Sequence, residues 1–346
     1  MDRMPLDPGS DIYKPRWLIS RTDRIVTAGS CFAQHVGRTL RNAGYNVLDT
    51  EPVAPRQLRA KLTPDLMSKY GFGIYSARYG NIYTVRQLLQ LIREARGQFS
   101  PAEAVWQKNG RFFDAFRPSV EPDGLDSAED VIAHRQQHLA AVRTLVRRAD
   151  VFVFTFGLTE AWVHTASDTV YPTAPGTLAG VFDPDVYSFR NFGFNSIYSD
   201  FVEVRRILMQ RNPDMRFLIT VSPVPLTATA SGQHVEVATT YSKAVLRAVC
   251  GALYEEFDNI DYFPSYEIIT SQSARGMYYE SNMRNVTPHG VSRAMSAFMH
   301  AHGDEAGPVD PDSARKPAAT AAPEKRRKKT QETLVCEDAL LEVFAR

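Results

Sequence analysis

One apolar run near the middle of the chain restricts the fold more than any other feature. Residues 151–157 read VFVFTFG, where β-branched and aromatic side chains follow one another without alternating with polar ones. Such a strand is covered on both faces, which is the position of a central strand in a parallel sheet. A long helical pattern at 130–150 leads directly into it. The run therefore predicts an α/β fold.

Short apolar runs alternate with helical patterns over most of the sequence. This order predicts an α/β/α sandwich around a mostly parallel, doubly wound sheet, with ligands bound beyond the carboxyl ends of the strands. The expected strands are 24–29, 45–49, 151–157, 215–225 and 260–269, and the expected helices are 32–43, 85–97, 130–150, 201–214, 239–259 and 287–303.

Composition and charge exclude several classes of protein. The 346 residues, 44% of them apolar, allow a large core, and 40 basic against 39 acidic residues give no overall charge that would recruit nucleic acid. Three widely spaced cysteines favour neither a disulfide framework nor a zinc cage, and no signal peptide or long apolar stretch is present. We expect a soluble, cytoplasmic protein that binds no membrane, metal or cofactor. His134 and His138 share a helical face but lack a third ligand, so a solvated face is the expected reading.

The chain divides into four parts. Residues 1–19 form an N-terminal arm, and 20–303 the folded domain. Residues 304–332 have the composition of a disordered linker, and its basic tract KRRKK is read as solvated, with nucleic-acid binding as a weaker alternative. Residues 333–346 predict a short amphipathic helix that docks back on the domain or binds a protein partner.

The first strand ends in a glycine, a serine and a cysteine. Gly29 permits a tight turn, and Ser30 and Cys31 would lie at the N-terminus of the next helix. The exposed N–H groups and the helix dipole there can lower a thiol pKa and hold an oxyanion. Alternatively, Ser30 only caps the helix and Cys31 packs as a small apolar side chain.

Two other segments carry candidate catalytic groups. Thr159 and Glu160 follow the central strand, where they suit substrate binding or acid–base work, or else start a helix as its cap and first acid. His289 would lie in the first turn of the last helix, where the dipole keeps an imidazole neutral. Alternatively, His289 is a surface or capping residue.

Several motifs in order resemble those of the GSCFA domain family. They are TAGSCFAQHVGRTL, FGIYSARYGNIYTVRQLLQL, FFDAFRP, FGLTEAW, TVSPVPL, YSKA and YFPSYEI, and they extend over roughly residues 20 to 300. That family is similar to the SGNH, or GDSL-like, hydrolases, which implies a flavodoxin-like three-layer fold. The resemblance places Cys31 at the nucleophile position, Gly80 and Asn81 in the second block, and Thr159 at the position of an oxyanion-binding Asn.

The fourth block of that superfamily, D-x-x-H, is altered here. The aligned residues run from Asn282 to Asn285, so the resemblance implies a dyad of Cys31 and His289, with Glu160 or an Asn orienting the imidazole. The expected function is an esterase-like hydrolase or acyltransferase acting on an oxygen ester of a small molecule or glycan, such as O-acyl groups of a carbohydrate. It would form an acyl-enzyme on Cys31 or, alternatively, on Ser30, with proton transfer by His289. The alternative is an inactive binding or scaffold protein that retains the fold.

Overall fold

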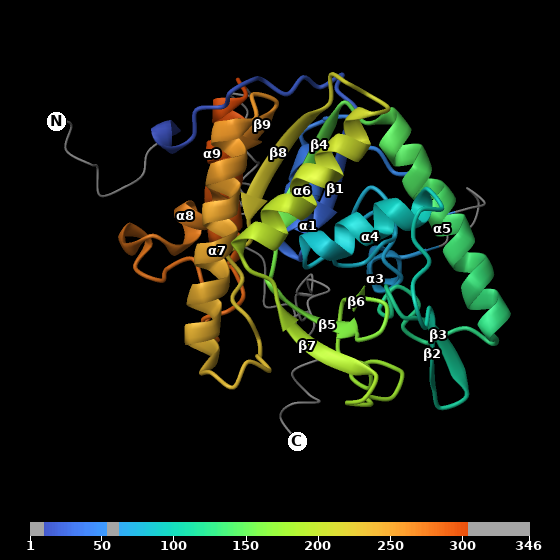
Figure 1. The fold of residues 1–346 in the computed structure, drawn as a ribbon. Coiled ribbons are helices and arrows are strands. Elements are labelled where there is room, and N and C mark those ends of the chain that lie inside the picture. The colour runs from blue at the N-terminus through green and yellow to red at the C-terminus, as the bar shows by residue number, and fades with distance from the viewer. Residues whose placement is uncertain (1–9, 54–61, 304–346) are drawn as a thin grey trace, which may run out of the picture.

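A parallel four-stranded sheet forms the centre of the computed structural model, which describes residues 10–53 and 62–303 (Figure 1). The strands are β1 (Ile25–Gly29), β4 (Val151–Phe156), β8 (Arg216–Val221) and β9 (Ile260–Tyr262), in the order β1-β4-β8-β9. A single parallel bridge between Ile25 and Val47 adds a fifth chain segment outside β1. In chain order the sheet reads 2-1-3-4-5, which is the flavodoxin-like order.

The strand expected at 45–49 is reduced to that bridge. Backbone hydrogen bonds join Ile25 to Asn46 and Leu48, but the N–H of Thr50 already donates to the carbonyl of Ser76. The chain therefore leaves the sheet edge after one pair of bonds, because residues 76 onward offer it a different partner.

Helices cover both faces of the central sheet, which confirms the three-layer α/β/α architecture. Phe152, Phe154 and Phe156 of β4 pack into the core under one helical layer, and Val151 and Val153 into the core under the other. The first layer contains α4 (Val85–Ala95), α5 (Ala128–Arg148), α6 (Phe194–Met209) and α7 (Val235–Glu256), and the second α1 (Phe32–Asn42), α8 (Ser265–Thr270) and α9 (Pro288–Ala301). The short helices α3 (Pro64–Lys69), η1 (Ser10–Ile12) and η2 (Gln272–Ala274) complete the described helices.

Two antiparallel additions are not foreseen by the sequence pattern. One is the hairpin of β2 (Val105–Lys108) and β3 (Arg111–Asp114), and the other a three-stranded sheet of order β6-β5-β7. The strands of the latter are β5 (Glu160–His164), β6 (Thr169–Tyr171) and β7 (Tyr187–Asn191). Figure 1 shows this sheet at the end of the molecule toward which β4 and β8 point. The alternative that Thr159 and Glu160 start a helix is wrong, because Glu160 opens β5 and pairs with Asn191.

The segment before β1 holds the last strand and the last helix together. The Tyr13 hydroxyl donates to Asp261 Oδ2 at 2.8 Å and lies 3.5 Å from His302 Nε2. The Ile19 N–H donates to His302 Nδ1 at 3.2 Å. Residues far apart in the chain thus close one end of the second helical layer.

The expected linker and C-terminal helix, 304–346, lie outside the described residues. Within 10–53 and 62–303, every helix is too short or too polar to span a lipid bilayer.

Candidate functional site

The turn after β1 places Ser30 and Cys31 at the start of α1. Gly29 has φ +133°, and an added Cβ would lie 2.5 Å from the carbonyl oxygen of Thr155 on β4. The Ser30 N–H donates to that oxygen at 3.3 Å. Cys31 is the N-cap residue of α1 with no side-chain capping bond, and Ser30 Oγ has no hydrogen-bond partner among residues 10–53 and 62–303. The alternative in which Ser30 serves as a helix cap is therefore wrong.

A pocket opens where β1, β4 and β8 end. Segments following these three strands, together with the loop before α9, supply its walls, as the fold predicts for a doubly wound sheet. The lining residues are Ser30, Cys31, Tyr83, Gly157, Leu158, Ser222, Val224, Pro225, Leu226, Thr227 and Arg284.

Two polar groups of this pocket lack partners. Ser30 is 3% exposed, and its buried Oγ forms no hydrogen bond. The Arg284 Nε is also buried without a partner, and no hydrogen bond or ion pair to its guanidinium is found in the described part of the chain. Buried polar groups are normally satisfied, so each such group at a pocket is a candidate ligand contact.

Behind the pocket lies a buried lysine of α7. Lys243 is 2% exposed, and its Nζ donates to the carbonyl oxygen of Gly157 at 2.8 Å. Burial lowers the pKa of Lys243 to about 7, and the negative charge of a Cys31 thiolate opposes that decrease. Gly157 touches the turn as well, since an added Cβ would lie 2.8 Å from Ser30 Cβ. In the sequence, Lys243 and Ser242 stand among the apolar positions of a long predicted helix, and this pattern could have indicated a buried lysine.

Asn81 is linked to the turn through Tyr75. Its Oδ1 accepts from the Tyr75 hydroxyl, and its Nδ2 donates to the Tyr83 hydroxyl at 2.8 Å. The Tyr75 hydroxyl also lies 3.1 Å from the carbonyl oxygen of Ser30, so its one hydrogen is shared between the two acceptors. Gly80 and Asn81 line a different pocket, so Asn81 is placed to support the turn rather than to contact a ligand beside Cys31.

Thr159 and Glu160 lie next to the pocket without lining it. The Thr159 N–H donates to Ser242 Oγ at 3.2 Å, and its own buried Oγ1 has no partner. Glu160 Oε1 accepts from the Thr229 hydroxyl at 2.8 Å, in the loop that follows β8. Burial raises the pKa of Glu160, and the Thr229 hydrogen bond opposes this.

The predicted base is not among the residues that line the pocket. His289 is exposed, with its ring 5.5 Å from that of Tyr278. Asn282 Oδ1 accepts from the backbone N–H groups of Arg284 and Asn285 at 3.0 Å each, so it shapes the loop. The altered fourth block thus contributes Arg284 to the pocket, a residue that the sequence reasoning missed because a loop has no periodicity to orient it.

The comparisons support the expected family. The sequence model of the GSCFA family matches residues 24–298. The chain belongs to the GSCFA family. Its eponymous residues, 29–33, form the turn and first helical residues described above. Neither the curated proteins nor the solved structures gave a significant match.

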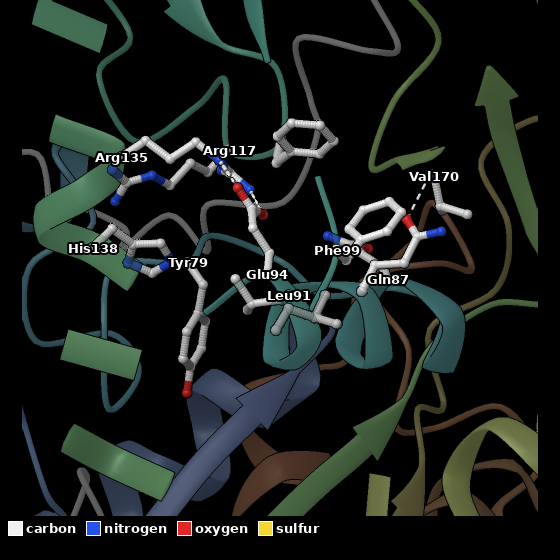
Figure 2. Close-up of a pocket in the computed structure, with 12 residues that line it drawn as sticks. Tyr79, Gln87, Leu91, Glu94, Phe99, Arg117, Arg135, His138 and Val170 are labelled. Atoms are coloured by element: carbon white, nitrogen blue, oxygen red, sulfur yellow. Dashed lines mark hydrogen bonds and ion pairs between the residues drawn. The ribbon is translucent and has the colours of Figure 1, made fainter. Parts of the chain in front are cut away.

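A second pocket of this GSCFA protein is lined by ion pairs (Figure 2). Arg135 bonds to Glu94 and Asp114, and Arg117 Nε donates to Asp114 Oδ2 at 2.8 Å. Burial would raise the pKa of Asp114, but Arg135 and Arg117 outweigh it and lower that pKa. These groups are satisfied by one another, so the cluster is structural and fixes the β2–β3 hairpin to α5. No group of metal-ligating side chains is found in the residues that the structure describes.

His138 belongs to this cluster instead of a solvated face. It is 1% exposed, and its Nδ1 lies 2.7 Å from Glu51 Oε2. Burial lowers the pKa of His138 to about 4, Arg117 adds to this, and Glu51 opposes it. The solvated reading failed because Glu51, far away in sequence, provides a partner for the ring.

Acid is expected to destabilise this GSCFA domain before its carboxylates titrate. Burial lowers the pKa of both His138 and His302 to about 4, so the unfolded chain binds their protons more tightly. The contribution of these two neutral histidines to the free energy of unfolding is complete above about pH 6.5, and it is lost as the pH falls toward 4. Between pH 7.5 and pH 5, each histidine should reduce the free energy of unfolding by about 2 kcal/mol, measurable by urea denaturation.

A pair of variants isolates one of these groups. His302→Asn keeps an acceptor for the Ile19 N–H, and should make the decrease smaller by about 2 kcal/mol, the share of one such histidine. His234→Asn is the matched control, because the exposed His234 also accepts a backbone N–H, that of Glu236. Equal pH dependence in wild type and His302→Asn would contradict the assignment.

Proposed function

We propose that this protein is an acyl-ester hydrolase or O-acyltransferase with Cys31 as its nucleophile. The observation that carries the proposal is the position of Cys31 in a pocket at the ends of β1, β4 and β8, at a helix N-terminus and in front of the buried Lys243. A thiol needs less activation than a hydroxyl, and a nearby cation favours its nucleophilic thiolate.

The reaction proceeds through a thioester. The Cys31 thiolate attacks the ester carbonyl carbon, an S–C bond forms, and the C–O bond breaks as the alkoxide leaves and takes a proton from solvent water. Water, or an acceptor alcohol in the transferase case, then attacks the thioester carbonyl and releases the thiolate. The backbone N–H of Cys31 is the proposed oxyanion donor in both steps, since the N–H groups of Ala33 and Gln34 already donate to the carbonyls of Ser30 and Cys31.

The resemblance of the sequence motifs to those of the SGNH hydrolases favours ester chemistry. The strand order is the flavodoxin-like one expected of that superfamily, and the Gly29-Ser30-Cys31 turn ends the first strand, where the resemblance places a nucleophile. O-acyl groups of carbohydrates are the proposed substrates by analogy with the same superfamily.

Hydrolysis of p-nitrophenyl acetate and butyrate tests the nucleophile. Cys31→Ala should lower kcat/KM by about 100-fold or more. His289→Ala is the matched control, because His289 lies outside the pocket, and this variant should retain most activity. Loss of activity in His289→Ala would instead support a catalytic dyad of Cys31 and His289. Loss in Ser30→Ala alone would identify Ser30 as the nucleophile.

A binding or scaffold protein is the second candidate function. The exposed position of His289 favours it, because no histidine lines the pocket beside Cys31. Absence of turnover by the wild-type protein, together with no acyl adduct on Cys31 by mass spectrometry, would favour this candidate over the enzyme.

A further inference from the structure

Arg284 gives the candidate pocket a positive charge that no acidic side chain neutralises. Among the residues that line the pocket, none is an aspartate or a glutamate. The guanidinium of Arg284 has no hydrogen bond or ion pair to any described residue, although its Nε is buried. Arg284 is half-buried, so part of its guanidinium is removed from water without a partner, and a negatively charged ligand would supply the missing hydrogen bonds.

Other arginines near pockets of this protein are compensated. Arg117 and Arg135 of the second pocket are both bonded to Asp114, and Arg78 is bonded to Glu121. The difference indicates that the Arg284 charge is available to a ligand rather than used by the fold.

Three further features favour a negative group in the pocket. The helix α1 is eleven residues long, and its N-terminus, capped by Cys31, contributes the positive end of the helix dipole. Lys243 lies behind the Gly157 carbonyl. Ser30 Oγ, in a side chain 3% exposed, has no partner and is a hydrogen-bond donor for an oxygen of the ligand.

We propose that the substrate of this pocket is an acyl compound that carries a carboxylate, which pairs with Arg284 while its ester carbonyl lies at Cys31. That the bound compound is a substrate rests on the proposed function. That the pocket binds a carboxylate rests only on the residues of the pocket. A single guanidinium matches the charge and the planar shape of a carboxylate, to which it can donate two hydrogen bonds. Half-esters of dicarboxylic acids have the required chemistry.

Alkylation of Cys31 tests the carboxylate site without assuming any catalysis. Iodoacetate and iodoacetamide have nearly the same size and attack the same thiolate, but only iodoacetate carries a carboxylate. The rate of alkylation by iodoacetate divided by that by iodoacetamide is measured at Cys31 by mass spectrometry of its peptide. This ratio should fall about three- to tenfold in Arg284→Gln. Arg284→Lys keeps the charge and should keep most of the ratio.

Arg275→Gln is the matched control for a neighbouring arginine. Arg275 is exposed and does not line the pocket, so its replacement should leave the ratio unchanged. Cys250 provides an internal reference, because it is completely buried in the core. An unchanged ratio in Arg284→Gln, or no alkylation of Cys31 by either reagent in the wild type, would overturn the proposal.

A pair of esters separates this inference from the proposed function. The succinyl and butyryl esters of p-nitrophenol differ by a carboxylate in place of a methyl group. The wild type should prefer the succinyl ester, and Arg284→Gln should lose that preference about three- to tenfold. Turnover of both esters with no effect of Arg284 would refute the carboxylate site alone. No turnover, with an alkylation ratio that depends on Arg284, would refute the acyl chemistry alone.

Discussion

Replacement of Lys243 by methionine is expected to reduce turnover of p-nitrophenyl esters at pH 7 by about tenfold or more. The Lys243 ammonium and the Cys31 thiolate attract each other, so its removal disfavours the reactive form of the thiol. Alkylation of Cys31 by the neutral reagent iodoacetamide tests this cause. In Lys243→Met, the plot of alkylation rate against pH should move toward higher pH.

Stability separates this effect from general damage to the fold. Methionine fills a similar volume and removes a buried charge, which compensates for the lost hydrogen bond to the Gly157 carbonyl. The thermal midpoint should therefore change little. Lys243→Arg keeps the charge but needs more space, and Lys108→Met is the exposed control. An unchanged pH–rate curve in Lys243→Met would contradict the electrostatic role.

Replacement of Gly29 by alanine is expected to destabilise the domain by about 4 kcal/mol. At φ +133° an L-residue is strained, and the new Cβ would lie 2.5 Å from the Thr155 oxygen and 2.7 Å from the Thr155 nitrogen. Both contacts are backbone atoms of the adjacent central strand, so they cannot move without opening the β1–β4 pairing. Urea denaturation monitored by circular dichroism measures the loss.

Gly97→Ala is the matched control for backbone strain. Gly97 also has a positive φ, +70°, but nothing lies within 4 Å of an added Cβ. It should cost about 1 kcal/mol. Similar losses in the two variants would show that the contact with β4 is not what excludes a side chain at Gly29.

The parallel core was predictable because its residues are constrained by both local pattern and burial. The run at 151–157 predicts a strand covered on both faces, and the helical periodicity at 130–150 predicts the helix that precedes it. The sheet β6-β5-β7 was not predictable, since EAWVH lies immediately after a strand and its polar residues also suit a helix start. Its pairing with 187–191 depends on contacts distant in sequence.

The candidate site was predictable only where a strand end defines it. Gly29, Ser30, Cys31 and Gly157 follow directly from the ends of β1 and β4. Lys243 reaches the site from the middle of a helix, and only the three-dimensional structure shows which carbonyl its Nζ meets. The prediction for His289 failed for the opposite reason. Its position at a helix start could be predicted, but that position alone does not determine what the first turn of the helix faces.

The bonds of Tyr13 and Ile19 to Asp261 and His302 have a consequence for the order of events during biosynthesis. A nascent chain emerges from the ribosome with its N-terminal portion first, and domains generally fold as units. The apolar faces of Tyr13 and Ile19 therefore remain without their α9 contacts until α9 has emerged from the ribosome. Chaperones that bind such surfaces should stay associated with the nascent chain until residue 302 has emerged from the ribosome, and should then be released.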